Sequence, residues 1–264
     1  METTERKVCF ITGSGSGNGR TMAIRMAQHG YDIALHHSGR DPESAEEVRR
    51  AVTDLGVRCE VFVEDLRASG AAARLFAGFR GKFRRLDVFV NNAGITRFAN
   101  ADVMEEEIYD AVNAIDLRAA MFCIREAGNF MREHGTQGLI VAIATNHHDR
   151  LWRHAPVYGS LKEALCRYVK YAAVEYARYG IRVNCIAPGY IYREYGIKPE
   201  TEEVFAWICR KEIPLHRFVT STEIADWVEF FASPAALSLT GQTVDLDGGA
   251  SLLSGGMAEY GLET

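Results

Sequence analysis

The feature that most constrains this chain is the regular alternation of short apolar runs with longer helical segments. Apolar runs rich in β-branched residues predict buried strands, here at about 8–12, 33–35, 58–63, 86–90, 138–144, 182–187 and 243–246. The intervening patterns predict helices at about 18–29, 42–55, 69–82, 104–133 (broken into two pieces), 156–179 and 224–232. Strands that alternate with helices form right-handed βαβ units. We therefore predict an α/β fold, a single-domain doubly wound parallel sheet with helices on both faces.

Ligands of such sheets bind beyond the carboxyl ends of the strands. This rule gathers the turns at about 13–19, 65, 91–94, 145 and 188 around one crevice. Two helix starts also carry capping signals. Asp41-Pro42 predicts an N-cap followed by a first helical residue. Thr220 with Glu223 predicts a capping box.

Composition excludes several classes of protein. The chain has 264 residues, 47% of them hydrophobic, which suits one large domain. A net charge of -5 favours neither nucleic acid nor a membrane surface as partner, and no apolar run is long enough to span a bilayer. Six cysteines without a CxxC pair indicate reduced thiols in a cytoplasmic protein. No spacing of His, Cys or Asp matches a metal site, so we expect no catalytic metal.

A glycine-rich segment, Thr12–Gly19, follows the first predicted strand and opens the first predicted helix. Glycines let a backbone approach a pyrophosphate closely, and a helix N-terminus favours its negative charge. The segment therefore predicts a dinucleotide site, with an ordinary strand-to-helix turn as the other interpretation.

The end of the second predicted strand bears on which dinucleotide binds. An acidic residue there would accept the ribose 2′-hydroxyl of NAD, but the segment 35–40 has none. Ser38 and Arg40 could instead hold a 2′-phosphate, because a guanidinium matches phosphate geometry. NADP(H) is therefore favoured. The neighbouring Asp41 keeps NAD(H) open, and Arg40 as a solvated turn residue is the plain alternative.

Tyr158 and Lys162 are four positions apart in a segment with Pro156 suited to a first helical turn. That spacing places the phenol and the ammonium on one helix face. A fixed cation beside a tyrosine favours the phenolate, which can exchange a proton with an alcohol or carbonyl oxygen. The pair alone is weak evidence for a catalytic role, and the other motifs of the chain strengthen it.

With these motifs in place, nearly the whole chain resembles the classical short-chain dehydrogenase/reductase family. Thr12–Gly19 resembles its TGxxxGxG loop, although Asn18 stands where a small aliphatic residue is usual. Further segments of this chain resemble the family's other motifs, in the same order: Asp65-Leu66, Asn91–Gly94, Gly180–Gly189, Gly241-Gln242 and Asp247–Gly249.

The resemblance implies a Rossmann fold over residues 1–264 and hydride transfer between a substrate carbon and nicotinamide. Tyr158 would be the acid/base, assisted by Lys162, with Thr145 and Asp116 completing the catalytic group. The expected cofactor-binding residues are Gly13, Ser14, Gly17, Asn18, Gly19, Ser38, Arg40, Asp65, Leu66, Asn92, Ala93, Gly94, Tyr158, Lys162, Pro188, Gly189 and Ile191.

Three positions depart from the family pattern. Thr145 stands thirteen positions before Tyr158, where the family has serine; it keeps the hydroxyl and adds a methyl group. Asp116 stands where the family has asparagine, and its carboxylate could pair with Lys162 and weaken that cation's effect. Arg193 replaces a threonine that often contacts the carboxamide, and could bind an anionic group or remain solvated.

The segment after Thr145 is unusually polar for a pocket wall, and it resembles the loop of the glucose dehydrogenase branch. The expected substrate residues are Asn146, His147, Trp152 and Tyr190. They favour a sugar or polyol; an aromatic ketone and a solvated surface loop are the alternatives. Adjacent His147 and His148 cannot both face one site from a regular strand. A substrate lid is expected at about 190–215.

The predicted function is an NAD(P)-dependent oxidoreductase for a secondary alcohol or its ketone. The alternative is a non-catalytic dinucleotide-binding redox sensor, which the Asp116 and Arg193 departures favour. A third interpretation is a subunit kept mainly for assembly. The resemblance implies a homotetramer or homodimer formed through the long helices.

Overall fold

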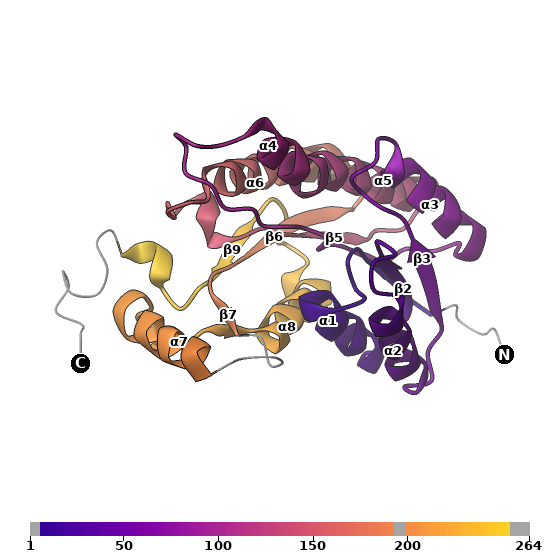
Figure 1. Ribbon diagram of the computed structural model, residues 1–264. Helices are drawn as coiled ribbons and strands as arrows, with labels where there is room; N and C mark the ends of the chain where they lie inside the picture. The colour runs from indigo at the N-terminus through magenta and orange to yellow at the C-terminus, as the bar shows by residue number, and fades with distance from the viewer. Residues whose placement is uncertain (1–5, 193–198, 254–264) are drawn as a thin grey trace.

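The computed structural model describes residues 6–192 and 199–253. Among these residues, seven parallel strands form one sheet in the order β3-β2-β1-β4-β5-β6-β9 (Figure 1). The strands are β1 (Val8–Ile11), β2 (Asp32–His37), β3 (Cys59–Val63), β4 (Val88–Asn91), β5 (Leu139–Ile143), β6 (Arg182–Pro188) and β9 (Thr243–Leu246). The predicted doubly wound parallel sheet is confirmed. The strand order reverses between β1 and β4, which is where such sheets bind ligands.

Helices cover both faces of this sheet (Figure 1). One face carries α3 (Ala71–Lys82), α4 (Glu106–Val112), α5 (Ala120–Glu133) and α6 (Pro156–Ala177). The other carries α1 (Gly17–Gln28), α2 (Pro42–Thr53) and α8 (Ser221–Ala232). Short 3₁₀ turns span Asn146–His148, Pro234–Ala236 and Ala250–Leu252.

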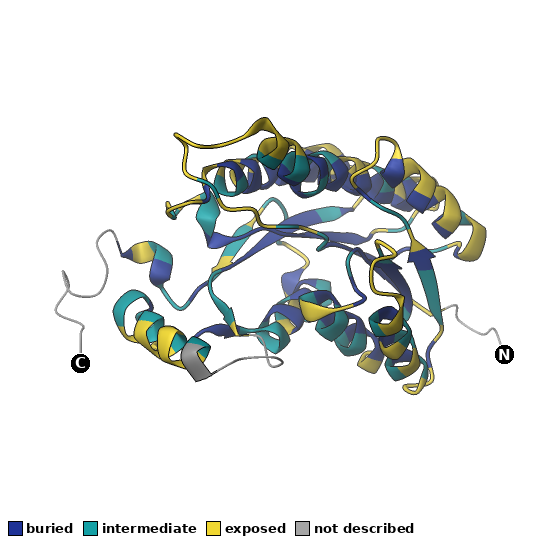
Figure 2. Ribbon diagram, in the orientation of Figure 1, coloured by how far each residue is buried: buried dark blue, intermediate teal, exposed yellow. Residues whose placement is uncertain are grey.

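Two hydrophobic cores lie on the two faces, and the buried residues follow the sheet and the helix sides turned toward it (Figure 2). Alternation along β1 divides its side chains between the cores. Phe10 packs in the α3 and α5 core, where its ring stacks on Phe79 at 4.8 Å between centroids. Cys9 and Ile11 pack in the α1 and α8 core. The strands are therefore buried on both sides, which fixes where their carboxyl ends place the connecting turns.

The predicted helix starts are observed. The Asp41 carboxylate accepts a hydrogen bond of 3.0 Å from the Ser44 N–H at the start of α2. Thr220 and Glu223 form a reciprocal capping box at the start of α8. Pro156 is the first residue of α6.

One prediction needs correction. The helical segment at 104–133 contains two α-helices, but no break separates them, because α4 continues through a π-helical turn (Asn113–Ala119) into α5. The segment expected to be a lid holds elements that the sequence patterns did not predict. It contains β7 (Ile191–Tyr192), which pairs in parallel with β8 (Val219–Thr220), and helix α7 (Pro199–Glu212). Two-residue strands carry no periodic signal, so sequence patterns could not predict them. Arg193 lies outside the described residues.

The described residues hold no helix with the length and apolarity needed to cross a membrane. Over the same ranges, no three His, Cys, Asp or Glu side chains are grouped so as to hold a metal ion.

Candidate active site

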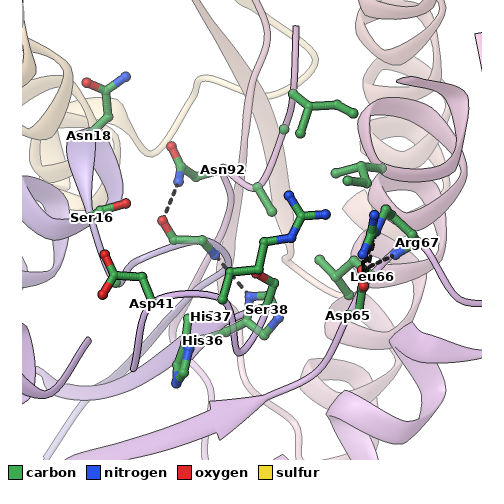
Figure 3. Close-up of a pocket in the computed structure, with 17 residues that line it drawn as sticks. Ser16, Asn18, His36, His37, Ser38, Asp41, Asp65, Leu66, Arg67 and Asn92 are labelled. Atoms are coloured by element: carbon green, nitrogen blue, oxygen red, sulfur yellow. Dashed lines mark hydrogen bonds and ion pairs between the residues drawn. The ribbon is translucent and has the colours of Figure 1, made fainter. Parts of the chain in front are cut away.

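The turns after β1, β2, β3 and β4 surround a cavity of about 400 Å³, drawn in Figure 3. Its lining includes nine of the predicted cofactor residues, namely Gly13, Asn18, Ser38, Arg40, Asp65, Leu66, Asn92, Ala93 and Gly94. A second cavity of about 660 Å³ lies beside it and shares Asn18, Asn92, Gly94 and Ile95 with it. Its lining includes Tyr158, Lys162, Pro188, Gly189 and Ile191. The two cavities form one crevice at the carboxyl ends of the strands.

Hydrogen bonds to the turn after β4 hold the glycine loop in place. The Thr12 hydroxyl accepts hydrogen bonds from the N–H groups of Asn92 (3.0 Å) and Ala93 (3.1 Å). The Asn92 amide donates in return to the carbonyls of Thr12 (3.0 Å) and Gly13 (3.1 Å). Gly19 must lack a side chain, because a Cβ there would lie 2.2 Å from the Gly13 carbonyl oxygen. This packing holds the start of α1 against the crevice.

Three predicted cofactor residues do not line either cavity. Ser14 is buried, and its hydroxyl donates to the Ile11 carbonyl and accepts from the His36 N–H. Gly19 is enclosed by the loop itself. Gly17 lines a groove on the outer side of α1 instead. Ser14 and Gly19 are buried and shape the loop, whereas Gly17 is exposed on a side that does not face the cavity.

His36, at the end of β2, lines the smaller cavity and was not singled out from the sequence. Its Nδ1 accepts a 3.0 Å hydrogen bond from the Gly13 N–H, and its Nε2 donates a 2.9 Å hydrogen bond to the Glu64 carbonyl. The ring therefore joins the turns after β1 and β3, and it must be neutral to do so. Burial lowers the pKa of His36 to about 4, which keeps the ring neutral at physiological pH.

This anchor predicts acid sensitivity. An unfolded chain protonates His36 near pH 6.5, while the folded chain resists protonation down to about pH 4. The contribution of His36 to stability is therefore complete above pH 6.5 and is lost as pH falls toward 4. We expect His36→Phe to lower the free energy of unfolding at pH 7 by about 1–3 kcal/mol, since it leaves two buried backbone groups unpaired.

Urea unfolding of both proteins between pH 7 and pH 4 measures this effect. The stability difference between wild type and His36→Phe should shrink as pH falls below 6.5. A difference that is constant over this range would contradict the role of the neutral imidazole.

The end of the crevice where adenosine is expected contains two arginines and two carboxylates (Figure 3). Asp65 forms an ion pair with Arg67, whose hydrogen bonds lower the pKa of Asp65 to about 2. Asp41 is the N-cap of α2. Arg40 lines the same cavity. Both oxygens of Asp65 are thus engaged by Arg67, whereas Asp41 uses only Oδ1 in the cap and keeps its other oxygen able to accept a hydrogen bond.

The predicted catalytic residues converge on the larger cavity. Tyr158 and Lys162 lie on α6, with the Lys162 Nζ 5.7 Å from the centroid of the Tyr158 ring. Thr145 follows β5 and lines the same cavity. The Lys162 ammonium also donates a 3.0 Å hydrogen bond to the Ile143 carbonyl, two residues before Thr145. This bond fixes the cation against the end of β5.

Asp116 contacts Lys162 directly, at 3.1 Å between Oδ1 and Nζ. Both side chains are buried, and the other Asp116 oxygen accepts a 2.9 Å hydrogen bond from the Ile95 N–H. Burial opposes the charge on Lys162, but the Asp116 carboxylate outweighs it, so the pKa of Lys162 is raised. A Cβ at Gly94 would lie 2.6 Å from Asp116 Oδ1. The π-helical turn therefore carries an ion pair where the family pattern has an asparagine.

Of the predicted substrate residues, His147, Trp152 and Tyr190 line the larger cavity. Asn146 does not, because its buried amide donates to Asp247 at 3.2 Å. As the sequence predicted, the adjacent histidines diverge. His148 points away from the cavity to Asp245, whose hydrogen bond raises the pKa of His148 to about 9.

The wall of this cavity contains polar atoms without protein partners. His147 Nδ1 and Trp152 Nε1 are buried and have no hydrogen-bond partner in the part of the chain that the structure describes. Burial and the nearby Arg150 lower the pKa of His147 to about 4, so its ring is neutral. Sequence reasoning missed Thr96, Phe98 and Arg153, which also line the cavity. Thr96 and Phe98 lie in an irregular loop and belong to no motif, so no signal marked them, whereas Arg153 lies in the polar segment after Thr145 without having been singled out.

Comparisons with known proteins agree with this architecture. The model of the family described as enoyl-(acyl carrier protein) reductase matches residues 13–251. The uncharacterized oxidoreductase YohF of Escherichia coli is 34% identical over 93% of this chain and 96% of its own. Glucose 1-dehydrogenase of Gluconobacter oxydans is 30% identical over 93% and 92%.

Among solved structures, the acetoin dehydrogenase YohF from Salmonella typhimurium superimposes with a TM-score of 0.84 at 29% identity. The match covers 95% of this chain and 98% of that one. With the glycine loop, the Tyr158 and Lys162 pair and the seven-stranded parallel sheet in place, these matches show that the chain belongs to the short-chain dehydrogenase/reductase family of oxidoreductases.

Proposed function

We propose that the protein is an NADP(H)-dependent oxidoreductase that interconverts a secondary alcohol and its ketone, with a small hydroxylated compound such as a sugar or polyol as substrate. The observation that carries this proposal is the placement of Tyr158, Lys162 and Thr145 around one cavity that adjoins the glycine-loop crevice. An acid/base and a dinucleotide site are thus neighbours, as hydride transfer to or from an alcohol carbon requires.

Each residue has a distinct part in this chemistry. A bound nicotinamide supplies or accepts the hydride. Tyr158 exchanges the proton at the substrate oxygen, and the buried Lys162 ammonium favours the phenolate. The Thr145 hydroxyl accepts a 3.4 Å hydrogen bond from the His147 N–H, which leaves its own proton free to donate to the substrate oxygen. Thr145 therefore holds the oxygen on which Tyr158 acts.

The adenosine end supports NADP(H) over NAD(H), the alternative. Arg40 and Arg67 line the cavity there, Arg67 engages the Asp65 carboxylate, and Asp41 caps α2 through one of its two oxygens. We expect Arg40→Ala to weaken NADPH binding about tenfold or more, because a charge-assisted hydrogen bond to phosphate is lost. NADH binding should change less than twofold.

Calorimetric titration of wild type and Arg40→Ala with NADPH and NADH measures both affinities. A wild type that prefers NADH would reject the NADP(H) proposal, and no binding of either would reject the dinucleotide site.

The substrate class rests on the unpartnered polar atoms of the cavity wall. Groups built to hydrogen-bond hydroxyls discriminate strongly for a hydroxylated ligand. The names of the relatives, an acetoin dehydrogenase and a glucose 1-dehydrogenase, suggest small oxygenated substrates as well. The test is nicotinamide absorbance with a panel of sugars, polyols, hydroxyketones and aromatic ketones. Turnover confined to aromatic ketones would reject the polyol class.

One observation favours a second candidate, a non-catalytic dinucleotide-binding redox sensor. The Asp116 carboxylate lies 3.1 Å from Lys162 and offsets the cation that the tyrosine needs. Tight NADPH binding without turnover across the whole panel would support this candidate over the enzyme.

Assembly through the long helices is also part of the proposal. Phe122 on α5 and Tyr171 and Val174 on α6 are large apolar side chains exposed by 45%, 65% and 79%. Such a surface suits a homodimer or homotetramer, and sedimentation as a monomer would contradict it. The free cysteines of the described chain suit a cytoplasmic location.

A further inference from the structure

Helix α7 is joined to the substrate loop by a partly buried ion pair. Glu212, the last residue of α7, accepts a 2.7 Å hydrogen bond from Nη2 of Arg150, which lies in the loop after β5. The side chains of Arg150 and Glu212 are only 16% and 27% exposed. The other terminal nitrogen of Arg150, Nη1, is buried without a hydrogen-bond partner in the described chain. One carboxylate and one aromatic face therefore hold this guanidinium.

The aromatic face belongs to Trp152, which begins a series of ring contacts that ends at Tyr158, the proposed acid/base. The Arg150 guanidinium lies 4.7 Å from the Trp152 ring centroid. Trp152 stacks on His147 with centroids 5.0 Å apart and planes at 14°. The His147 ring meets Tyr158 edge to face, at 5.5 Å and 88°. Each ring in the series limits where the next can lie, because their faces or edges are in contact.

A second set of contacts leads from the same tryptophan back to α7. Trp152 meets Tyr190 at 4.5 Å and 83°, and Tyr190 stacks on Phe218 at 5.2 Å and 15°. Phe218 in turn contacts Phe205 of α7 at 4.7 Å. Helix α7 thus meets the ring series both through the charge on Glu212 and through an aromatic side chain.

We propose that Arg150 is a positioning residue. It couples the position of α7, through Trp152 and His147, to the position of the Tyr158 ring on the side that faces the substrate. This inference rests on the proposed oxidoreductase function. A planar guanidinium can stack on an indole and bind a carboxylate at the same time, which a lysine ammonium cannot do with the same geometry. The ion pair therefore acts on the larger cavity through Trp152 and His147, which line it, and not on the smaller cavity, which none of these three residues lines.

The first test is the isosteric Glu212→Gln variant. Its matched control is Glu133→Gln, which removes a comparable pair, because Arg80 bonds Glu133 at 2.6 Å and lies 5.1 Å from the Phe130 ring on a remote surface. We expect Glu212→Gln to raise KM for the best panel substrate about tenfold, as loss of a charged hydrogen bond predicts. NADPH affinity should stay within twofold of wild type, and the control should behave as wild type throughout.

A double-mutant cycle tests whether the effect passes through the indole. Glu212→Gln and Trp152→Phe should be non-additive in kcat/KM by about threefold or more. Arg150→Lys should reproduce the KM of Glu212→Gln although it keeps the positive charge. Additive effects in the cycle, or a wild-type KM in Arg150→Lys, would overturn the coupling.

Iodide quenching separates failure of this inference from failure of the proposed function. In a Trp207→Phe, Trp227→Phe background, which leaves Trp152 as the one tryptophan of the three in the sequence, Glu212→Gln should expose Trp152 and raise the quenching constant about twofold, and Glu133→Gln should not. Raised quenching without turnover of any panel substrate would support the coupling and reject the oxidoreductase. Turnover with both KM and quenching unchanged would reject the coupling alone.

Discussion

Replacing Tyr158 with phenylalanine is expected to lower kcat by about 10²–10⁴-fold, the range that general acid–base catalysis contributes. The ring contact with His147, at 5.5 Å between centroids, needs no hydroxyl and should persist. Lys162 keeps its bonds to Ile143 and Asp116, so the cavity should retain its shape. NADPH should therefore bind with unchanged affinity while turnover is nearly lost.

Steady-state kinetics and NADPH titration of the same preparation check this result. Tyr171→Phe is the matched control, since that side chain lies on the same helix outside both cavities and the substitution keeps the apolar ring proposed for assembly. Its kcat should match that of wild type. If Tyr158→Phe kept half of the wild-type kcat, the proton would have to pass through another group, and the proposed mechanism would be wrong.

Asp116→Asn is expected to change the pH dependence of the reaction more than any other conservative substitution. The carboxylate lies 3.1 Å from the Lys162 ammonium and raises the pKa of Lys162, so removing its charge lowers that pKa. The remaining cation is then no longer neutralised, and it favours the phenolate of Tyr158 more strongly. We expect the midpoint of log kcat/KM for alcohol oxidation to move about one unit or more toward lower pH.

The same substitution should destabilise the fold. It leaves the buried Lys162 without a counter-charge, while the asparagine oxygen still accepts from the Ile95 N–H. We expect a loss of about 1–3 kcal/mol in the free energy of unfolding. Asp110→Asn, an exposed site on α4, is the control for both measurements. An unshifted pH–rate profile in Asp116→Asn would show that the carboxylate does not tune the acid/base.

Much of this fold could be predicted because its signals are local. The apolar run at 8–12 and the glycine loop after it define a strand, a turn and a helix within one short segment. The capping box at Thr220 and the proline that starts α6 were likewise readable from adjacent residues. The exceptions were the π-helical turn and the two-residue strands, whose backbone depends on contacts from elsewhere, and helix α7, which lies in the segment expected only to be a lid.

The candidate site likewise combines features that local sequence predicts with features that depend on the tertiary structure. The spacing of Tyr158 and Lys162 by one helical turn determined their pairing, and the rule that parallel strands end at one edge gathered the turns around a crevice. Chemistry alone suggested that Asp116 could pair with Lys162. Only the tertiary structure brought the two atoms to 3.1 Å, because that distance depends on how the π-helical turn packs against α6.

The sequence by itself determined the order of the sheet strands and of the helices between them, the glycine-rich turn after β1 and the pairing of Tyr158 with Lys162, since short-range spacing fixes each of them. The tertiary structure decided that His36 joins two turns, that Asn146 faces away from the cavity and that Arg150 meets Glu212. Arg150 and Glu212 are 62 positions apart in the chain. Contacts of this kind depend on loop conformation and on strand register, which arise only when both hydrophobic cores pack against the sheet.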